Sequence, residues 1–370
     1  MKIGFDIQST LGPFSGLGVY TRNILETVAP GHDTQRPCRY QDLEFYFFSQ
    51  PAVKPWNTLQ RLWWENVTRS RLMRQNGVDL LHVPAFSPPI LKPRGVRLVT
   101  TVHDLIGMLF PNQRGAFSRF YWGKWLPRAV QNSDVLIADS ENTKKDIIKH
   151  LQVPSEKIRV IYLSGHEGFR PGISAEQIQA VKAGRGIRGR YFLFVGTLEP
   201  RKNLSRTLQA FGKFQREHGE GRDRQLVVVG SKAFAHGAFY KELLEKNAVD
   251  LQDVIFTDYV GHEELNALYC GAEAFLYPSL YEGFGIPLLE AMGSGTPVIA
   301  SRTSSVPEVA GDAALLVDPL SADEITNAML EISRSASLHS ELVNKGFLRI
   351  KKFSWAGMVR ELISVYQSLA

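Results

Sequence analysis

A short stretch of the chain, residues 273–300, contains a complete strand–helix–strand pattern. The apolar segment EAFLY ends at Tyr277, a loop with two glycines follows, and Pro287 then starts a helix that leads to the apolar segment GTPVIA. Proline suits the first helical position because its missing N–H would be unpaired there. Strand-like and helix-like segments alternate in the same way along the whole chain. We therefore predict an α/β fold with two doubly wound parallel sheets.

The loop and the first turns of this helix contain Glu282, Gly283, Phe284, Gly285 and Glu290. Glycines let backbone amides approach a ligand closely, and a helix amino terminus favours anions. Two glutamates at this place would repel a phosphate. We therefore interpret them as acceptors for the hydroxyl groups of a sugar or a ribose. The alternative is that they only complement the helix dipole.

The length of the chain, 370 residues, exceeds what one hydrophobic core usually supports, so we predict two domains. The glycine-rich, irregular segment 164–189 is the expected linker between them. We place the first domain at residues 1–175 and the second at residues 187–354.

Positive charge is concentrated near the start of the chain. The net charge is +6, and residues 1–130 contain sixteen Lys and Arg against eight Asp and Glu. Such a basic region fits an anionic membrane surface or a diphosphate substrate. The basic residues form no stripe and no nucleic-acid-binding module is recognisable, so we do not expect nucleic acid as a partner.

Segments 56–74 and 117–128 mix aromatic and basic side chains on expected helices. Either their aromatic faces pack on a sheet while the arginines stay in solvent, or they lie at a membrane interface. We identify no signal peptide, and no apolar run approaches the roughly 20 residues that span a bilayer. Cys38 and Cys270 give no disulfide framework. The expected location is the cytoplasm, with peripheral contact at the inner face of the membrane as an extension.

Two adjacent cations, Arg201 and Lys202, follow the strand at residues 191–195 and the glycine that ends it, Gly196. Cations near a helix amino terminus are unfavourable unless they share an anion. A diphosphate would supply that anion, with arginine offering a fork and lysine a point charge. The alternative is a pair of solvated surface cations.

Two further candidates follow strands of the first half. His103 comes directly after the strand at residues 97–102, and Gly16 and Gly18 come after the first strand. Ligands of open parallel sheets bind at the carboxyl ends of strands, where a histidine can bond a sugar hydroxyl or accept a proton. A structural histidine is the alternative. The glycine pair is either a phosphate-loop pattern or a tight turn. A Rossmann dehydrogenase needs an acidic residue at the end of the second strand, but this chain has Ser49 there, which argues against a dehydrogenase.

Together these motifs resemble a known family. The stretch EGFGIPLLE resembles the E-x7-E signature of glycosyltransferase family 4, and the flanking segments GTLEPRKN, GTPVIA and SVPEV agree with it. The resemblance covers nearly the whole chain and is strongest to the branch that contains O-antigen mannosyltransferases. It implies the GT-B fold, in which two Rossmann-like domains face a cleft. It also implies that residues 355–370, which carry a helical apolar stripe, cross back onto the first domain.

The same resemblance implies which residues act. The implied catalytic residues are His103, Arg201, Lys202 and Glu282. The implied donor-binding residues are Gly16, Gly18, Gly196, Val260, Leu265, Gly283, Phe284, Gly285 and Glu290. At residues 164–168 the chain reads SGHEG where family members usually have Asn-Gly-Val-Asp, so we expect a different hinge geometry.

These motifs predict transfer of a sugar from a nucleotide donor to an acceptor hydroxyl, and the resemblance implies retention at the anomeric carbon. The sequence contains no Asp-x-Asp and no cluster with metal-ligand spacing, so we expect neither a metal nor another cofactor. The resemblance favours GDP-mannose over a UDP- or dTDP-sugar, with a glycan or lipid-linked glycan of surface polysaccharide synthesis as acceptor. The alternatives are a nucleotide-sugar epimerase, a phosphorylase and a non-catalytic sugar-binding module.

Overall fold

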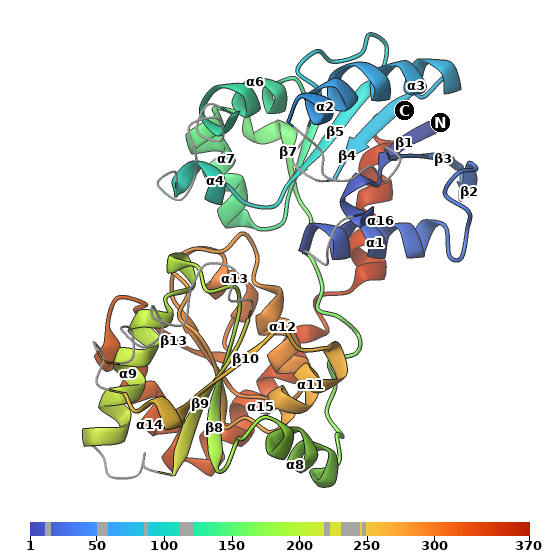
Figure 1. Cartoon of the computed structure of the whole chain (residues 1–370). Helices are drawn as coiled ribbons and strands as arrows, with labels where there is room; N and C mark the ends of the chain where they lie inside the picture. Colours follow the sequence, from blue (N-terminus) through green and yellow to red (C-terminus); the bar gives the residue numbers. More distant parts are fainter. Residues whose placement is uncertain are drawn as a thin grey trace. The chain divides into compact units, whose positions relative to one another are not determined.

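The chain divides into two compact units, each built on its own sheet (Figure 1). The structure is a computed structural model that describes residues 1–11, 16–49, 58–84, 88–110, 121–217, 223–230, 245 and 249–370. The first unit comprises Met1–Leu163 and Trp355–Ala370, and the second comprises Ser164–Ser354.

The segment expected to be an irregular linker, residues 164–189, lies in the second unit and contains the helix α8 (Ala175–Gly184). Its glycines suggested a loop, but Ser174 and Gln177 form a reciprocal capping box at the start of this helix. That local hydrogen bonding supplies partners for amides that a helix start leaves unpaired. The prediction of a linker without secondary structure is therefore wrong.

The first sheet has the strand order β2-β3-β1-β4-β5-β6-β7. Its strands are β1 (Lys2–Asp6), β2 (Cys38–Tyr40), β3 (Leu43–Phe48), β4 (Leu80–Val83), β5 (Arg97–Val102), β6 (Val135–Ala138) and β7 (Ile158–Val160). The pairs from β3 to β7 are parallel, whereas β2 is antiparallel to β3 at the sheet edge. The three residues of β2 carry too little alternation to be read from the sequence.

The second sheet has the order β10-β9-β8-β11-β12-β13, which is the doubly wound Rossmann arrangement. Its strands are β8 (Arg190–Val195), β9 (Arg224–Val229), β10 (Val254–Asp258), β11 (Ala274–Tyr277), β12 (Val298–Ser301) and β13 (Ala314–Val317). All of these pairs are parallel, as predicted.

Helices cover both faces of each sheet (Figure 1). In the first unit they are the short η1 (Gln8–Leu11), α1 (Gly16–Val28), α2 (Thr58–Trp63), the π-helix η2 (Trp64–Thr68), α3 (Arg69–Asn76), α4 (Ile106–Leu109), the π-helix η4 (Tyr121–Trp125), α6 (Leu126–Gln131), α7 (Glu141–Leu151), η5 (Ser155–Lys157) and α16 (Trp355–Gln367). In the second unit, besides α8, they are η6 (Pro200–Lys202), α9 (Leu204–Glu217), η7 (Leu251–Asp253), α11 (His262–Cys270), α12 (Ile286–Gly293), α13 (Val306–Ala310), α14 (Ala322–Arg334) and α15 (Ala336–Ile350).

The last helix, α16, packs beside α1 in the first unit although it follows the second unit in the chain (Figure 1). Its apolar stripe is buried as the spacing predicted, at Val359, Leu362, Ile363 and Tyr366. This burial explains why a segment so far along the chain belongs to the first core.

The aromatic and basic segment at 58–74 combines packed and exposed side chains. Trp64 is buried and Trp63 is 64% exposed. Arg69 is fully buried and pairs with Asp6 at the end of β1, so the expectation that the arginines here stay in solvent is wrong for this residue. Residues 56–57 and 117–120 of these two segments lie outside the described residues. Within the described ranges, no helix is long and apolar enough to cross a membrane.

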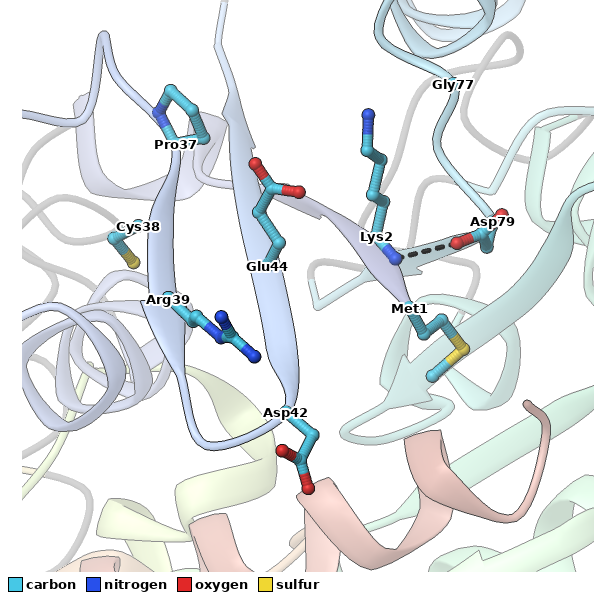
Figure 2. Close-up of a pocket in the computed structure, with 9 residues that line it drawn as sticks. All are labelled: Met1, Lys2, Pro37, Cys38, Arg39, Asp42, Glu44, Gly77 and Asp79. Atoms are coloured by element: carbon cyan, nitrogen blue, oxygen red, sulfur yellow. Dashed lines mark hydrogen bonds between the residues drawn. The ribbon is translucent and has the colours of Figure 1, made fainter.

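A cavity of about 650 Å³ lies at the amino ends of β1, β3 and β4. Figure 2 shows its charged lining, in which the backbone N–H of Lys2 donates to Asp79 Oδ2 at 2.7 Å, beside Glu44. Open parallel sheets bind their ligands at the carboxyl ends of strands. In the first sheet, this cavity therefore lies at the opposite end of the strands from the candidates His103, Gly16 and Gly18.

Candidate active site

In the second unit, the candidate site forms where β8 and β11 lie side by side at the reversal of the strand order. The loop after β11 ends at Gly285, which has a φ of +114°, a conformation that favours glycine. Because Gly285 makes this turn, α12 begins at Ile286 and Pro287 takes its second position. The prediction that Pro287 is the first helical residue is off by one.

Arg201 and Lys202 share an anion that belongs to the protein itself. Lys202 Nζ lies 2.6 Å from Glu282 Oε1, and Arg201 Nη1 lies 3.1 Å from Glu282 Oε2. Arg201 Nε also donates to Glu199 Oε2 at 2.8 Å. The carboxylate of Glu282, rather than a ligand, therefore resolves the charge conflict seen in the sequence. Lys202 is only 8% exposed, which also rules out a pair of solvated surface cations.

The two cations keep Glu282 ionised. Burial by itself would raise the pKa of this carboxyl, but the charges of Lys202 and Arg201 outweigh burial and lower the pKa. Lys202 Nζ also donates to the hydroxyl of Tyr277 at 3.2 Å. Its third N–H has no partner among the described residues, so the ammonium group retains one donor for a ligand.

Glu290, on α12, lies in a different environment from Glu282. The hydroxyl of Tyr269 donates to Glu290 Oε2 over 3.4 Å, and no cation pairs with this carboxyl among the described residues. Burial raises the pKa of Glu290 to about 7, while the bond from Tyr269 lowers it. The two glutamates of the motif thus differ: Glu282 is a charged member of an ion cluster, and Glu290 titrates near neutral pH.

The glycines and the aromatic residue around the cluster are closely packed. Gly196 follows β8, and a Cβ added there would lie 3.5 Å from the side chain of Lys202. Gly283 and Phe284 are buried, and the ring of Phe284 packs edge-to-face against Phe353. These three positions therefore adjoin the cluster or the loop that carries Glu282.

Val260 and Leu265 lie farther along the same sheet. Val260 is buried in the turn between β10 and α11, and Leu265 is in the first turns of α11. The same helix carries Tyr269, which bonds Glu290, and the assignment of Val260 and Leu265 to donor binding stays a prediction.

Other residues that hold the Glu282 loop did not stand out in the sequence. Ser305 Oγ donates to the carbonyl oxygens of Glu282 at 3.0 Å and Phe284 at 2.8 Å. The hydroxyl of Ser304 also donates to the Glu282 carbonyl, at 2.6 Å, and accepts from the N–H of the same residue. The paired serines before Pro307 were the available signal, because serine commonly bonds nearby backbone groups at helix starts.

In the first unit, His103 follows β5 as predicted, and both of its ring nitrogens are engaged. Nδ1 lies 2.6 Å from Asp139 Oδ2, and Nε2 lies 2.7 Å from the carbonyl oxygen of Pro84. Gly16 is the first residue of α1 with open space around it, and Gly18 is buried in the same helix. The rest of the expected glycine loop, residues 12–15, lies outside the described residues. Among the described residues, no group of three His, Cys, Asp or Glu side chains is arranged to hold a metal ion.

Comparison with known proteins identifies the family. A model described as "Glycosyl transferases group 1" matches residues 178–349, and one described as "Glycosyltransferase Family 4" matches residues 22–163. The O-antigen chain mannosyltransferase B of Escherichia coli is 31% identical over 291 residues, which are 78% of this chain and 74% of that protein. The chain belongs to glycosyltransferase family 4. It is therefore a glycosyltransferase, as the motifs predicted.

Two other comparisons add detail. The serotype-specific mannosyltransferase WbdA of Escherichia coli is 28% identical over 74% of this chain, and the match spans 34% of that longer protein. The structure of Anabaena HepE in complex with UDP-glucose superimposes with a TM-score of 0.75 at 16% identity, covering 100% of both chains. This likeness confirms the GT-B fold of the family 4 chain.

Proposed function

We propose that this glycosyltransferase transfers mannose from GDP-mannose to a hydroxyl group of a glycan or lipid-linked glycan in surface polysaccharide synthesis. The observation that carries the proposal is the cluster of Arg201, Lys202 and Glu282 at the strand-order reversal of the second sheet. The relatives named mannosyltransferases support mannose as the transferred sugar.

In this proposal the two cations of the cluster bind the diphosphate of the donor, and the carboxylate of the cluster binds its sugar. The diphosphate is bound by the third N–H of Lys202 and by Nη2 of Arg201, the guanidinium nitrogen that bonds neither Glu199 nor Glu282. Both groups stabilise the charge of the diphosphate as the bond to the sugar breaks. Glu282 accepts hydrogen bonds from hydroxyls of the sugar, and Glu290 accepts from those of the ribose. The sugar is transferred with retention, and the cluster, rather than a metal ion, supplies the positive charge.

The donor preference is tested by titrating GDP and UDP into the purified protein with a calorimeter. We expect GDP to bind at least about tenfold more tightly. UDP bound tenfold more tightly than GDP would overturn the choice of donor. The hydrolysis of GDP-mannose and UDP-glucose is then compared, and slow release of GDP from GDP-mannose argues against a binding module without turnover.

Metal independence has its own experiment. Transfer or hydrolysis of GDP-mannose is measured in excess EDTA, and we expect the rate to be unchanged. Loss of the rate in EDTA and recovery with Mg²⁺ or Mn²⁺ would show that the cluster does not supply the charge alone. Retention is checked by the anomeric configuration of the first-formed product in proton NMR spectra.

A further inference from the structure

The chain passes between the two units at two places, and the residues there are bonded to each other. The first passage precedes Ser164 and the second follows Ser354. We call residues 164–169 and 351–354 the first and second connecting segments, and both lie in the second unit. Ser164 is buried, and its hydroxyl donates to the carbonyl oxygen of Phe353 at 3.3 Å. This hydrogen bond joins one segment to the other.

The first connecting segment packs on α12 at Glu290. A Cβ added to Gly165 would lie 3.1 Å from Leu289 Cβ and 3.6 Å from the backbone nitrogen of Glu290. A Cβ contact of 3.1 Å is closer than a packed protein interior usually allows. Leu289 Cβ is bonded directly to the helix backbone, so it cannot turn aside as the end of a long side chain could. A side chain at residue 165 would therefore displace α12 beside Glu290.

The same segment reaches Glu290 by a second route. The rings of Phe169 and Tyr269 meet at 5.6 Å in a T-shaped arrangement, and the hydroxyl of Tyr269 donates to Glu290 Oε2. The carbonyl oxygen of Phe169 would lie 2.7 Å from a Cβ added to Gly293, the last residue of α12. The backbone of the segment thus abuts α12 at two points about one turn apart, beside Gly165 and at Gly293.

The second connecting segment packs on the loop of Glu282. The buried ring of Phe353 meets the buried ring of Phe284 edge-to-face at 5.7 Å. The guanidinium group of Arg349 lies 5.2 Å from the centre of the Phe353 ring, and its Nε donates to the carbonyl oxygen of Val309, on α13, at 2.8 Å. The serines that bond the backbone of Glu282 directly precede α13. The loop is therefore held by Phe353 directly and by Arg349 through α13.

We propose that the two connecting segments position the donor-binding motif, with Phe353 as the positioning residue for the loop of Glu282 and Gly165 and Phe169 as the positioning residues for Glu290. The proposal rests on the proposed function, in which Glu282 bonds the sugar and Glu290 bonds the ribose. The geometry of the donor site then depends on the residues through which the chain enters and leaves the second unit, besides the residues of the motif itself.

The support of the loop is tested by hydrogen exchange on the full-length protein, without any substrate. Phe353→Leu removes the ring and keeps an apolar side chain. The amides of residues 279–286 should then exchange at least about fivefold faster, relative to the amides of β9, because the loop opens more often. Unchanged exchange of residues 279–286 in this variant overturns the role of Phe353.

Phe214→Leu is the matched control for the loss of a ring. Phe214 meets Phe192 edge-to-face at 5.3 Å, and the guanidinium group of Arg224 lies 5.8 Å from its ring, so it resembles Phe353 in its contacts. Phe214 lies in the core of the second unit, on α9. Its replacement should lower stability but leave the relative exchange of residues 279–286 unchanged. Equal acceleration in both variants contradicts a specific role of Phe353.

Binding and turnover separate the two positioning roles. Phe353→Leu should lower kcat for GDP-mannose by at least about tenfold and leave Kd for GDP within about twofold, because it disturbs the sugar end of the site. Gly165→Ala should raise Kd for GDP by at least about fivefold, because α12 is displaced at Glu290. Gly184→Ala is the control for the added methyl group, since a Cβ on this last residue of α8 meets nothing within 4 Å, and it should leave Kd unchanged.

The fold of each variant is checked by circular dichroism, and loss of folded protein lowers the stoichiometry of GDP binding rather than its affinity. If Gly165→Ala does not fold, Phe169→Leu takes its place, because it removes the ring that packs on Tyr269 and should also weaken GDP binding. Unaltered affinity for GDP in the folded variant overturns the role of the first segment. If hydrogen exchange changes as expected but the unaltered protein turns over no sugar donor, the proposed function fails and the support of the loop stands.

Discussion

Single residues of the cluster depend on one another because Glu282 is buried between two cations. Removing Lys202 leaves the Glu282 carboxylate with Arg201 as its cationic partner and deprives the site of the closest donor, 2.6 Å away. We therefore expect Lys202→Ala, and Arg201→Ala to a similar degree, to reduce turnover by about 100-fold with the fold retained. Circular dichroism and steady-state rates check this.

Lys213→Ala is the matched control for these variants. Lys213 lies on α9 and pairs with Asp323, which is largely exposed, so its removal should leave turnover unchanged. Turnover near that of the unaltered protein in both Lys202→Ala and Arg201→Ala would remove the two cations from the site.

If Glu290 bonds the ribose as proposed, its titration should make the affinity for the nucleotide depend on pH. Its pKa is raised from 4.5 to about 7, so it is neutral below that pH and ionised above it. Ribose hydroxyls donate more strongly to the ionised form, so the affinity for GDP should rise as the pH increases through about 7. Calorimetry in buffers with different ionisation enthalpies should show proton release on binding.

Two variants separate the glutamates. Glu290→Gln should weaken binding of GDP and abolish its dependence on pH, because the titrating group is gone. Glu282→Gln should leave the affinity for GDP nearly unchanged and lower transfer instead. Equal, unaltered affinity for GDP in both variants would contradict the assignment of Glu290 to the ribose.

At the scale of elements, the loop between β11 and α12 is held by hydroxyl groups of the two serines directly before α13. Ser305 donates to the carbonyls of Glu282 and Phe284, both in this loop. Ser305→Ala should lower the free energy of unfolding by about 1–3 kcal/mol, because its hydrogen bonds to the carbonyls of Glu282 and Phe284 are lost, and should also reduce turnover. Urea denaturation and rate measurements check both effects.

Ser340→Ala controls for the loss of a hydroxyl. Ser340 lies on the exposed side of α15, and its hydroxyl donates to a carbonyl of its own helix, that of Ala336, at 2.9 Å. We expect little change in stability or turnover from this variant. A comparable loss in both serine variants would show that the bonds of Ser305 have no special effect on the loop.

At the scale of the whole molecule, the second unit is one continuous segment and the first is not. A fragment of residues 164–354 should therefore unfold cooperatively and bind GDP within about tenfold of the full chain, since the cluster and Glu290 lie within it. Residues 1–163 alone lack α16, whose buried stripe covers part of their core. They should unfold without a sharp transition, and fusing residues 355–370 to them should restore it. A fragment 164–354 that is unfolded contradicts this division.

Much of the fold was readable from the sequence because it is encoded by neighbouring residues. The alternation of strands and helices and the apolar stripe of α16 are both local patterns, and the structure has both. The motif from Glu282 to Glu290 sufficed to indicate the family. Short elements were harder to predict: β2 depends on its pairing with β3, and the start of α12 depends on the backbone angle of Gly285. The helix α8 does have a local cue, the Ser174–Gln177 capping box, but the glycines around it suggested a loop.

The partners inside the site were decided by the tertiary structure. Lys202 and Glu282 are 80 residues apart, and they meet because the strand order places β8 beside β11. His103 meets Asp139 across 36 residues, and His82 meets Tyr366 across 284. The sequence therefore determined which side chains were available and on which elements. The shared carboxylate of Glu282, the partners of His103 and the raised pKa of Glu290 follow from burial and long-range pairing, which exist only once the sheets have formed.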